Sequence, residues 1–594
     1  MPIDSRWQIP IPRCSLQQWI FGSACGPVGD HKSFVDPDNP EANYLTMSDF
    51  RLLAKRLALG LQREGLGKGD RVLIFSNNNL VFPSVFLGVL MAGGVVTGAN
   101  PTFVPRELAY QLRDSEARFL FVAEHAVKTA LEAAAEVGLP QNRIFVLGTN
   151  ASVPMSQIAR TLAPAPPAKN NVAAAAGVRH WTELLAGNLA KAEMWSWEEP
   201  ADPEHTTCCL NYSSGTTGVP KGVEITHYSY VANGAAVVFL MRLRPDWKEK
   251  EKRDNALAFL PLYHAYGQTF FVANLPHMRI PVYIMPSFNF PSFLKHIERF
   301  RITICPVVPP IVVLLAKSPL TKQHDLSSIE TLSSGAAPLS REICEEAERL
   351  FPQTNREKPL VIRQGWGMTE VTCSAMGWDP NTTAAPSAGV GELLPTFRAK
   401  LMSLEDGGKT EITQPNVRGE LWISGPTLLR RYWKKPEATA ETVVQDADGT
   451  RWLRTGDVAY VESYGPGAIF HVVDRVKELI KVKGNQVAPA ELEGVLLESP
   501  DVADAAVVGV TMPGEKGSGS SWEVPRAYVV RRPGSKATEA DVAKWMEGKV
   551  APYKRLTGGV VFVDVIPKNP SGKILRKQLR DRAQSEVAGQ SSKI

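Results

Sequence analysis

The alternation of apolar and polar positions in the first half of the chain predicts helices that alternate with buried strands. Between residues 45 and 65 the apolar positions follow the three- and four-residue spacing of one helix face; they are Phe50, Leu53, Leu57 and Leu61. Short apolar runs mark strands at 72–75, 118–122, 143–146, 206–212 and 255–259. This rhythm predicts an α/β fold in which largely parallel sheets are covered by helices.

One stretch is long and apolar enough to raise the question of a membrane span. Residues 80–99 carry no charge, and about twenty such residues suffice to cross a bilayer. Pro83 lies near the start of the stretch, however, and Gly93 and Gly94 interrupt it. These positions predict a buried helix to about Met91 and a strand from Val95, and therefore no membrane span.

Composition and length narrow the class of protein. A chain of 594 residues is too long for one ordinary core, so two or more domains are expected. The 66 basic and 61 acidic residues leave a net charge of only +5, which gives no case for nucleic-acid binding. The seven cysteines form no C-x-x-C pair, which favours buried thiols in a reducing compartment. The first twelve residues lack the apolar core of a signal peptide.

The first candidate for chemistry is a loop rich in glycine and hydroxyl side chains at residues 212–222, directly after the strand at 206–212. Its backbone N–H groups, its hydroxyls and one lysine suit a polyphosphate. It is not a Walker A motif, because Lys221 follows Pro220 and precedes Gly222. Composition alone fits a plain turn equally well. The candidate phosphate-binding residues are Ser213, Ser214, Gly215, Thr216, Thr217, Gly218 and Lys221.

The order of residues in this loop, S-S-G-T-T-G-x-P-K-G, resembles the signature of the adenylate-forming (AMP-binding) superfamily. Further motifs of that family follow in its order: L-P-L-Y-H-A-Y-G at 260–267, S-G-A-A-P-L at 334–339, Q-G-W-G-M-T-E at 364–370, R-T-G-D at 454–457 and P-K-N-P-S-G-K-I-L-R at 567–576. The block at 474–493 is nearly the consensus of the 4-coumarate-CoA-ligase-like branch. Six further motifs that follow the loop in the family's order are not independent accidents.

The resemblance implies a two-domain organisation. A large N-terminal adenylate-forming domain of mixed and parallel sheets covered by helices is expected at 1–474. A small, mobile α+β C-terminal domain is expected at 475–594, with the hinge at Lys477.

The same resemblance assigns residues to ATP and Mg2+. Thr369 is expected to contact the α-phosphate, Glu370 to hold Mg2+, and Asp457 and Arg475 to bind the ribose. Trp366 stands where the family usually has tyrosine; it keeps a flat face for the adenine and lacks the phenolic hydroxyl. The remaining residues expected around the nucleotide are Ala336, Gln364, Gly365 and Gly367.

The resemblance also implies an acyl pocket and a catalytic lysine. Lys573 is expected to neutralise charge between the acid and the α-phosphate. The pocket residues are His264, Tyr266, Gly335, Ala336 and Gly365, and the further catalytic candidates are His264, Lys477, Lys481 and Gln486. Lys483 and Gly484 are expected to meet CoA.

The implied activity is that of an acid–CoA ligase, which uses ATP to convert a carboxylic acid to acyl-AMP and passes the acyl group to CoA. Aromatic and fatty acids both fit this pattern. The alternatives are delivery of the acyl group to a separate carrier protein, and a catalytically silent AMP-binding protein. One departure concerns CoA: Ser287 stands where the family often has a lysine near a CoA phosphate.

The last three residues, Ser592-Lys593-Ile594, are close to the S-K-L peroxisomal address. They predict recognition by the peroxisomal import receptor, with the cytoplasm as the alternative location. Together with the branch motifs, this tail is similar to fungal peroxisomal aryl- or acyl-CoA ligases, including phenylacetyl-CoA-ligase-like and toxin-pathway enzymes. A role in secondary metabolism is the corresponding expectation.

Overall fold

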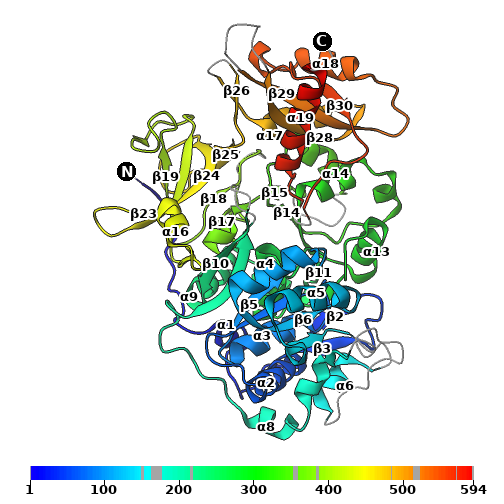
Figure 1. Cartoon of the computed structure of the whole chain (residues 1–594), viewed down its shortest axis with the longest axis vertical. Helices are drawn as coiled ribbons and strands as arrows, with labels where there is room; N and C mark the ends of the chain where they lie inside the picture. The colour runs from blue at the N-terminus through cyan, green and yellow to red at the C-terminus, as the bar shows by residue number, and fades with distance from the viewer. Residues whose placement is uncertain are drawn as a thin grey trace.

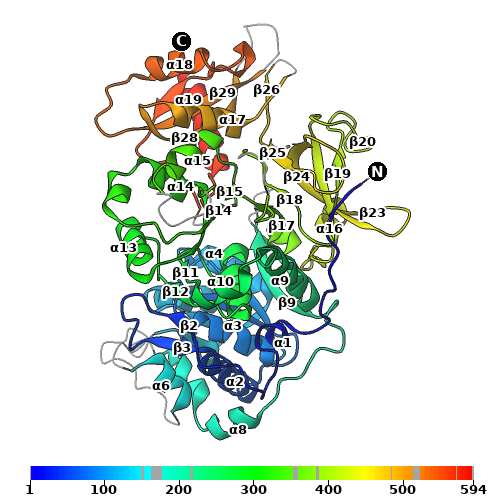
Figure 2. The ribbon, with the colours of Figure 1, turned by 180° about the vertical axis from the view of Figure 1, so that it is seen from behind.

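The computed structural model of the chain describes residues 2–148, 153–161, 177–213, 219–351, 359–382, 387–482, 485–512, 522–569 and 572–591. At Trp522 and at residues 588–591 it describes the backbone alone. Figures 1 and 2 show helix α2 (Met47–Arg63) toward one end of the long axis and helices α18 (Glu539–Glu547) and α19 (Arg576–Ser591) toward the other. The N-terminus lies between these ends, beside β19 (Arg398–Met402).

The first sheet has eight strands, and its parallel part is covered on both faces. Its order is β22-β10-β9-β5-β4-β6-β7-β8. Val72 and Ile74 pack with helices α2 (Met47–Arg63) and α3 (Phe82–Met91), whereas Leu73 and Phe75 pack with α4 (Pro105–Ser115) and α5 (Val127–Val137). The strands are β4 (Arg71–Phe75), β5 (Val95–Ala99), β6 (Ala117–Val122), β7 (Ile144–Val146), β8 (Arg179–His180), β9 (Thr207–Ser213), β10 (Lys221–Thr226) and β22 (Arg431–Tyr432).

The second sheet has seven strands in the order β15-β14-β13-β11-β12-β2-β3, and its neighbours are parallel except for the β2–β3 pair. Several of the expected nucleotide and acyl motifs directly follow its strands. In parallel sheets the carboxyl ends of the strands meet at one edge, where ligands bind. The strands are β2 (Lys32–Val35), β3 (Tyr44–Thr46), β11 (Ala256–Ala258), β12 (Val282–Ile284), β13 (Ile304–Val307), β14 (Thr331–Ser334) and β15 (Arg363–Gln364).

Two antiparallel sheets complete the N-terminal part. The third sheet contains β1 (Ile3–Asp4), β19 (Arg398–Met402), β20 (Glu411–Ile412), β21 (Gly419–Ser424), β23 (Val443–Gln445), β24 (Arg451–Val461) and β25 (Phe470–Arg475). A small sheet contains β16 (Trp366–Gly367), β17 (Ser374–Gly377) and β18 (Glu392–Leu393). Further helices are α9 (His227–Met241), α13 (Phe290–Phe300), α14 (Pro309–Lys317), α15 (Arg341–Glu348) and α16 (Pro436–Thr442).

The C-terminal part has a smaller sheet with its own apolar cores. Helices α17 (Pro489–Glu498) and α18 (Glu539–Glu547) contribute to one core, and α19 (Arg576–Ser591) contributes to the other. The strands are β28 (Val502–Met512), β29 (Trp522–Arg531) and β30 (Val560–Phe562), next to the hairpin β26 (Ile480–Val482) and β27 (Asn485–Val487). The expected fold class, large mixed sheets covered by helices plus a smaller α+β part, is confirmed. The boundary after residue 474 and the mobility of the smaller part stay predictions.

The apolar stretch at 80–99 folds as its glycines predict. Helix α3 ends at Met91, Gly93 takes a positive φ of 87°, and β5 begins at Val95. Every residue of both elements is buried in the first sheet and its helices. Among the described residues, no helix is both long and apolar enough to cross a membrane.

All seven cysteines are free thiols. Five are buried: Cys208, Cys209, Cys305, Cys344 and Cys373. The expectation of buried thiols is wrong for Cys25, which is exposed, and holds only in part for the half-buried Cys14. The sequence could not separate these two, because both precede the first sheet in a segment without a regular apolar pattern.

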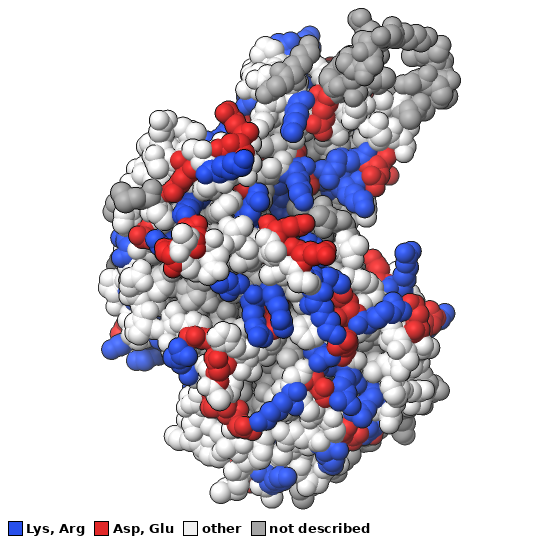
Figure 3. All heavy atoms as spheres, turned by 60° about the vertical axis from the view of Figure 1, so that its left-hand side comes forward, with Lys and Arg blue, Asp and Glu red and all other residues white. Residues whose placement is uncertain are grey.

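The small net charge is spread over the surface. Figure 3 shows lysine and arginine side chains interspersed with aspartate and glutamate over one face of the molecule. Many form exposed pairs, such as Lys68 with Glu198 at 2.7 Å and Arg301 with Asp325 at 2.7 Å. Exposed pairs of this kind stabilise a protein by about 0–1 kcal/mol each.

A fully buried arginine ties α2 to the segments that cover it. Arg56 donates to the backbone oxygens of Ile158 (3.1 Å), Ala159 (2.9 Å) and Leu185 (2.6 Å) and to Oδ1 of Asn188 (3.1 Å). Burial lowers the pKa of Arg56 to about 10, which leaves it charged at neutral pH. Its charge is therefore balanced by carbonyl dipoles, and those carbonyls depend on it.

Replacing Arg56 by methionine should lower the free energy of unfolding by about 3 kcal/mol or more, because buried carbonyl oxygens lose their donor. Thermal unfolding followed by circular dichroism measures the change. Arg63→Met is the matched control, since Arg63 lies on the same helix and bonds backbone oxygens at the protein surface. Equal shifts in the two variants would contradict the assignment.

Candidate active site

One short helix and the ends of two strands, β9 and β22, surround a buried carboxylate. Glu370 lies in the 3-10 helix η6 (Thr369–Val371) and is 5% exposed. Its Oε1 accepts a hydrogen bond from Oγ of Ser213, at the end of β9, and another from the hydroxyl of Tyr432 on β22, both at 2.9 Å. Among the described residues, no side chain bonds its Oε2. The carboxylate is thus fixed through one oxygen and can bind a further ligand through the other.

Tyr432 is a site residue that the sequence motifs did not reveal. It is buried, and burial together with the nearby Glu370 raises its pKa, so the hydroxyl stays a donor at neutral pH. Lys221 faces Ser213 across the β9–β10 ladder, and its Nζ lies 5.0 Å from the centre of the Tyr432 ring. Tyr432 therefore contacts both the Glu370 carboxylate and Lys221, the lysine of the candidate phosphate-binding loop at 212–222. Its only sequence signal is an aromatic residue in a basic run, which is too common to assign.

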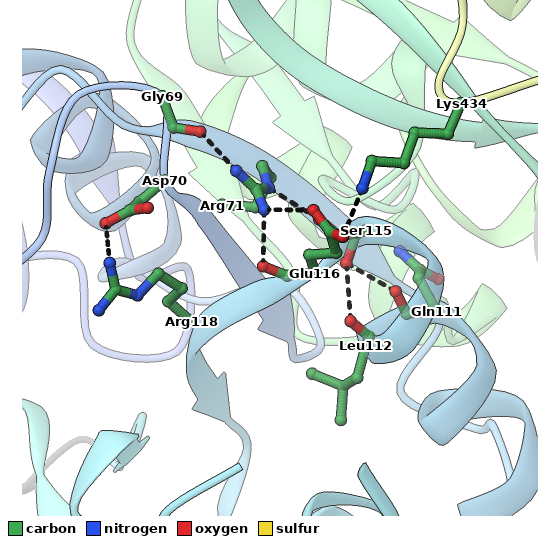
Figure 4. Close-up of polar contacts among 9 residues, drawn as sticks. All are labelled: Gly69, Asp70, Arg71, Gln111, Leu112, Ser115, Glu116, Arg118 and Lys434. Carbon is green, nitrogen blue, oxygen red and sulfur yellow. Dashed lines mark hydrogen bonds and ion pairs between the residues drawn. The ribbon is translucent and has the colours of Figure 1, made fainter. Parts of the chain in front are cut away.

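Charged groups at the end of α4 hold the segment that carries Tyr432. Figure 4 shows Arg71, the first residue of β4, donating to the backbone oxygen of Ser115 (2.8 Å) and to the carboxylate of Glu116 (3.0 Å). The same carboxylate pairs with Lys434. Two residues after Tyr432, the chain is therefore anchored to the first sheet.

Helix α4 also forms hydrogen bonds to residues at both ends of the candidate phosphate-binding loop. Asp114 accepts hydrogen bonds from the hydroxyl of Tyr212, before the loop, and from Nζ of Lys435, both at 2.8 Å. The hydroxyl of Tyr110 donates to the backbone oxygen of Pro220, after the loop, at 2.8 Å. One helix thus fixes the position of Tyr212, at the end of β9, and of Pro220, directly before β10.

A second carboxylate lies between an indole and a guanidinium. Oδ2 of Asp457, on β24, accepts a hydrogen bond from Nε1 of Trp366 at 2.8 Å. Oδ1 lies 3.3 Å from Nε of Arg475, its partner across the β24–β25 ladder. Asp457 therefore directly contacts both Trp366, expected at the adenine, and Arg475, expected at the ribose.

Lys573 reaches this region from the C-terminal part. Gly572 before it has a φ of 82°, and a side chain there would meet Pro310 and Val308 at 3.2 Å. The absence of a side chain lets this loop lie against the start of α14. Burial, and then repulsion by Arg475, lower the pKa of Lys573 to about 8, whereas Asp457 and Glu370 act in the opposite direction. The charge of Lys573 thus interacts with the carboxylates of both Asp457 and Glu370.

One expected acyl-pocket residue, His264, lies near this lysine, and Tyr266 and Gly335 contact each other. Burial and the charge of Lys573 lower the pKa of His264 to about 4, so its imidazole is neutral at pH 7. Its Nδ1 accepts a hydrogen bond from the backbone N–H of Tyr266 at 3.4 Å. The ring of Tyr266 lies over Gly335, where a Cβ would be 3.5 Å from the ring, and Ala336 next to it has a φ of 76°. A neutral histidine and small residues suit a pocket wall.

A model of the AMP-binding enzyme family matches residues 24–433, and a model of the AMP-binding enzyme C-terminal domain matches residues 491–573. The chain belongs to the AMP-binding enzyme family.

Relatives of this AMP-binding enzyme match over nearly their whole length. Acyl-CoA synthetase ACTT5 of Alternaria alternata is 34% identical and covers 93% of this chain and 88% of its own. Phenylacetyl-CoA ligase epaB of Aspergillus niger is 34% identical and covers 98% of both chains. The structure of ATP-bound MatB from Rhodopseudomonas palustris superposes with a TM-score of 0.77 at 24% identity, covering 96% of this chain and 99% of that chain. This last likeness supports the fold.

Some of the expected nucleotide residues of this AMP-binding enzyme shape the protein around the site. The side-chain amide of Gln364 accepts from the backbone N–H of Leu339 at 2.9 Å and donates to its oxygen at 2.8 Å. Its polar atoms are thus turned toward the loop after β14. Gly365 donates its N–H to the oxygen of Ser334 at 2.9 Å. At Gly367 a Cβ would lie 1.7 Å from the backbone oxygen of Cys373, so no side chain fits.

The structure does not bring every predicted residue of this AMP-binding enzyme to the carboxylates. Lys481 and Gln486 face each other across the β26–β27 hairpin and are exposed, and Lys477 is exposed before it. The hairpin is packed on β29, where the Lys481 N–H donates to Glu523 at 2.8 Å. The residues Ser214, Gly215, Thr216, Thr217, Gly218, Lys483 and Gly484 lie outside the described residues.

Proposed function

We propose that the chain is an ATP-dependent, AMP-forming acid–CoA ligase. The observation that carries the proposal is the position of Lys573, whose charge is coupled to Glu370, Asp457 and Arg475 although it belongs to the C-terminal part. A lysine held in this way can neutralise charge that develops between an acid and a phosphate. The acyl-CoA synthetase and CoA ligase names of the near-full-length relatives support the same activity.

In the first half-reaction the carboxylate of the acid attacks the α-phosphorus of ATP. The new bond joins the acid oxygen to phosphorus, and the bond to the leaving pyrophosphate breaks. The protein contributes position and charge: Lys573 at the α-phosphate, Lys221 at the leaving phosphates, and Asp457 at the ribose. The neutral His264 lines the pocket and carries no charge that would repel Lys573.

A magnesium ion fits the residues around Glu370. Mg2+ commonly binds through one or two carboxylates together with substrate phosphates, and Glu370 offers one fixed carboxylate with Oε2 available. Glu370 would hold the ion, which supplies neutralisation of the phosphate charge when bound.

In the second half-reaction the CoA thiol attacks the acyl carbonyl, the bond to AMP breaks, and AMP leaves. We place Lys483 and Gly484 at CoA after rotation of the C-terminal part about Lys477. The exposed positions of Lys481 and Gln486 support this rotation, because in the present arrangement they are turned to solvent. The Ser287 side chain is exposed and carries no charge, so it would give CoA no ionic contact there.

The deciding experiment incubates the full chain with ATP, Mg2+, CoA and a panel of aromatic and fatty acids, and measures the thioester. Thioester formation with CoA supports the proposal. Acyl transfer only to an added carrier protein would favour the carrier-protein alternative. Absence of pyrophosphate release with every acid would favour a silent AMP-binding protein.

Loss of the Tyr432 hydroxyl should raise the Mg2+ concentration needed for half-maximal pyrophosphate release about tenfold. Tyr432→Phe removes one of two donors on Glu370 Oε1, and a hydrogen bond to a charged group contributes about 1.5–3 kcal/mol. Tyr460→Phe is the control, because Tyr460 stacks on His471 in the third sheet. If the two variants need the same Mg2+ concentration for half-maximal pyrophosphate release, Tyr432 does not contribute to Mg2+ binding.

The adenylation step should weaken as the pH rises through about 8. The pKa of Lys573 is lowered from 10.5 to about 8, so its ammonium form is lost on the alkaline side of that value. The profile of kcat/KM for ATP reports groups of the free enzyme and should show this limb. Lys573→Arg keeps its charge to higher pH, so its limb should disappear; an unchanged limb would assign it to another group.

The location in peroxisomes and a role in secondary metabolism are further parts of the proposal. They are supported by the Ser592-Lys593-Ile594 sequence, which lies outside the described residues, and by the fungal relatives. A fluorescent reporter that ends in the last twelve residues of the chain tests the location. Punctate peroxisomal signal supports import, and a cytosolic signal contradicts it.

A further inference from the structure

The indole of Trp366 contacts the carboxylate expected to bind the ribose. Its Nε1–H donates to Oδ2 of Asp457 at 2.8 Å, and the two residues are 8% and 6% exposed. A hydrogen bond to a charged acceptor is strong when both partners are buried, and its geometry is well defined. The bond therefore fixes both the plane of the carboxylate and the plane of the indole.

The opposite oxygen of the same carboxylate is also held. Oδ1 lies 3.3 Å from Nε of Arg475, and the backbone N–H of Asp457 donates to Oγ1 of Thr455 at 3.0 Å. An ionised carboxylate has about four acceptor positions, two on each oxygen. The indole N–H occupies one position on Oδ2, and Oδ1 has the ion pair with Arg475, so each oxygen keeps at least one position for a ligand. Two such positions match the two neighbouring hydroxyls of a ribose.

The contact depends on where the donor lies on the aromatic ring. The N–H of an indole projects from the flank of the ring system, whereas the hydroxyl of a tyrosine projects from its tip. A phenylalanine has neither. Where the family usually has tyrosine, with a hydroxyl at the tip of its ring, this chain has Trp366, with an N–H on the side of its ring. This N–H donates to Asp457.

The bond also joins two parts of the fold that are separate sheets. Trp366 belongs to β16 of the small three-stranded sheet, and Asp457 belongs to β24 of the third sheet. The residue expected to bind the adenine and the residue expected to bind the ribose therefore move as one unit. A nucleotide would meet a surface whose two halves are already aligned.

We propose that the Trp366 indole N–H is a positioning group that orients the Asp457 carboxylate and thereby sets the preference for nucleotides with both ribose hydroxyls. The proposal rests on the proposed function, since it concerns the ATP of that reaction. Trp366 acts here through Asp457 and is not itself a group that contacts the reacting atoms.

The test measures the Kd of the full chain for ATP, 2′-deoxy-ATP and 3′-deoxy-ATP by titration calorimetry. In Trp366→Phe, which keeps a flat aromatic face, the ratio of the deoxy-ATP to the ATP Kd should fall about fivefold or more. The Kd for the deoxynucleotides themselves should change less than that for ATP. Trp366→Tyr should behave like Trp366→Phe, and it carries the test if the phenylalanine variant does not fold.

Two outcomes would overturn the proposal. One is an equal loss of affinity for all three nucleotides, which a purely structural or stacking role would give. The other is a wild-type ratio in Trp366→Tyr, which would show that the indole N–H is not needed. In an Asp457→Ala background, Trp366→Phe should leave the ratio unchanged. Because binding is measured without the acid or CoA, a chain that binds ATP but forms no thioester would count against the proposed ligase and not against this contact.

Discussion

Lys573→Ala should slow acyl-adenylate formation about a hundred- to a thousandfold, the loss typical of removing one group that stabilises developing charge. Its ammonium comes from the C-terminal part and interacts with the charges of both Glu370 and Asp457. Alanine leaves the negative charge of acid and phosphate uncompensated at the moment the bond forms. Pyrophosphate release under saturating ATP measures this step.

The second half-reaction separates a catalytic loss from a structural one. Thioester formation from supplied acyl-AMP should fall far less in Lys573→Ala, because the proposed rotation withdraws this lysine before CoA reacts. Lys568→Ala is a suitable control: Lys568 lies in the same loop, paired with Ile574 through the backbone, and its Nζ bonds Asp504 at 2.6 Å. Equal losses in both half-reactions would contradict the role assigned to Lys573.

Gly367→Ala should destabilise the enzyme by about 4 kcal/mol or more and abolish its activity. The added Cβ would lie 1.7 Å from the backbone oxygen of Cys373 and 2.8 Å from Cα of Ser374. Backbone atoms cannot rotate away as a side chain can, so β16 and β17 would have to separate. That separation would displace Trp366 and η6, which carries Glu370.

Gly365→Ala is the matched control for this overlap. The two glycines flank Trp366, but at Gly365 a Cβ would meet its nearest neighbour, the oxygen of Met376, only at 3.3 Å. The control should unfold within a few degrees of the wild type by differential scanning fluorimetry, whereas Gly367→Ala should unfold far earlier. Similar unfolding temperatures for the two variants would show that the β16–β17 pair adapts.

The pattern of apolar residues and glycines predicted those helices and strands whose bounds depend on neighbouring residues in the sequence. The glycines after Met91 end α3, and the apolar runs mark β4, β6 and β7 within one or two residues. The family resemblance supplied the fold class and the list of site residues. The motifs at 212–222 and 260–267 follow directly on strands that the apolar pattern predicted, whereas the other motifs were recognised by the order of their residues.

Contacts between distant segments could not be predicted in the same way. Nothing in the sequence near Tyr432 indicates that β22 pairs with β10 and brings its hydroxyl to Glu370. Likewise, a glutamine before Gly365 reads as a polar ligand, and only the packing of the loop after β14 turns its amide toward Leu339. Such facts depend on register and on which segments lie side by side.

The seating of the Gly572–Lys573 turn against Val308 and Pro310 bears on the order in which substrates are used. With this turn in place, the β26–β27 hairpin lies on β29 and its Lys481 and Gln486 are exposed. Under the proposed function this is the arrangement for the first half-reaction. Under the proposed function acyl-AMP forms before CoA can bind, so the release of pyrophosphate, more than the binding of CoA, would trigger the rotation of the C-terminal part.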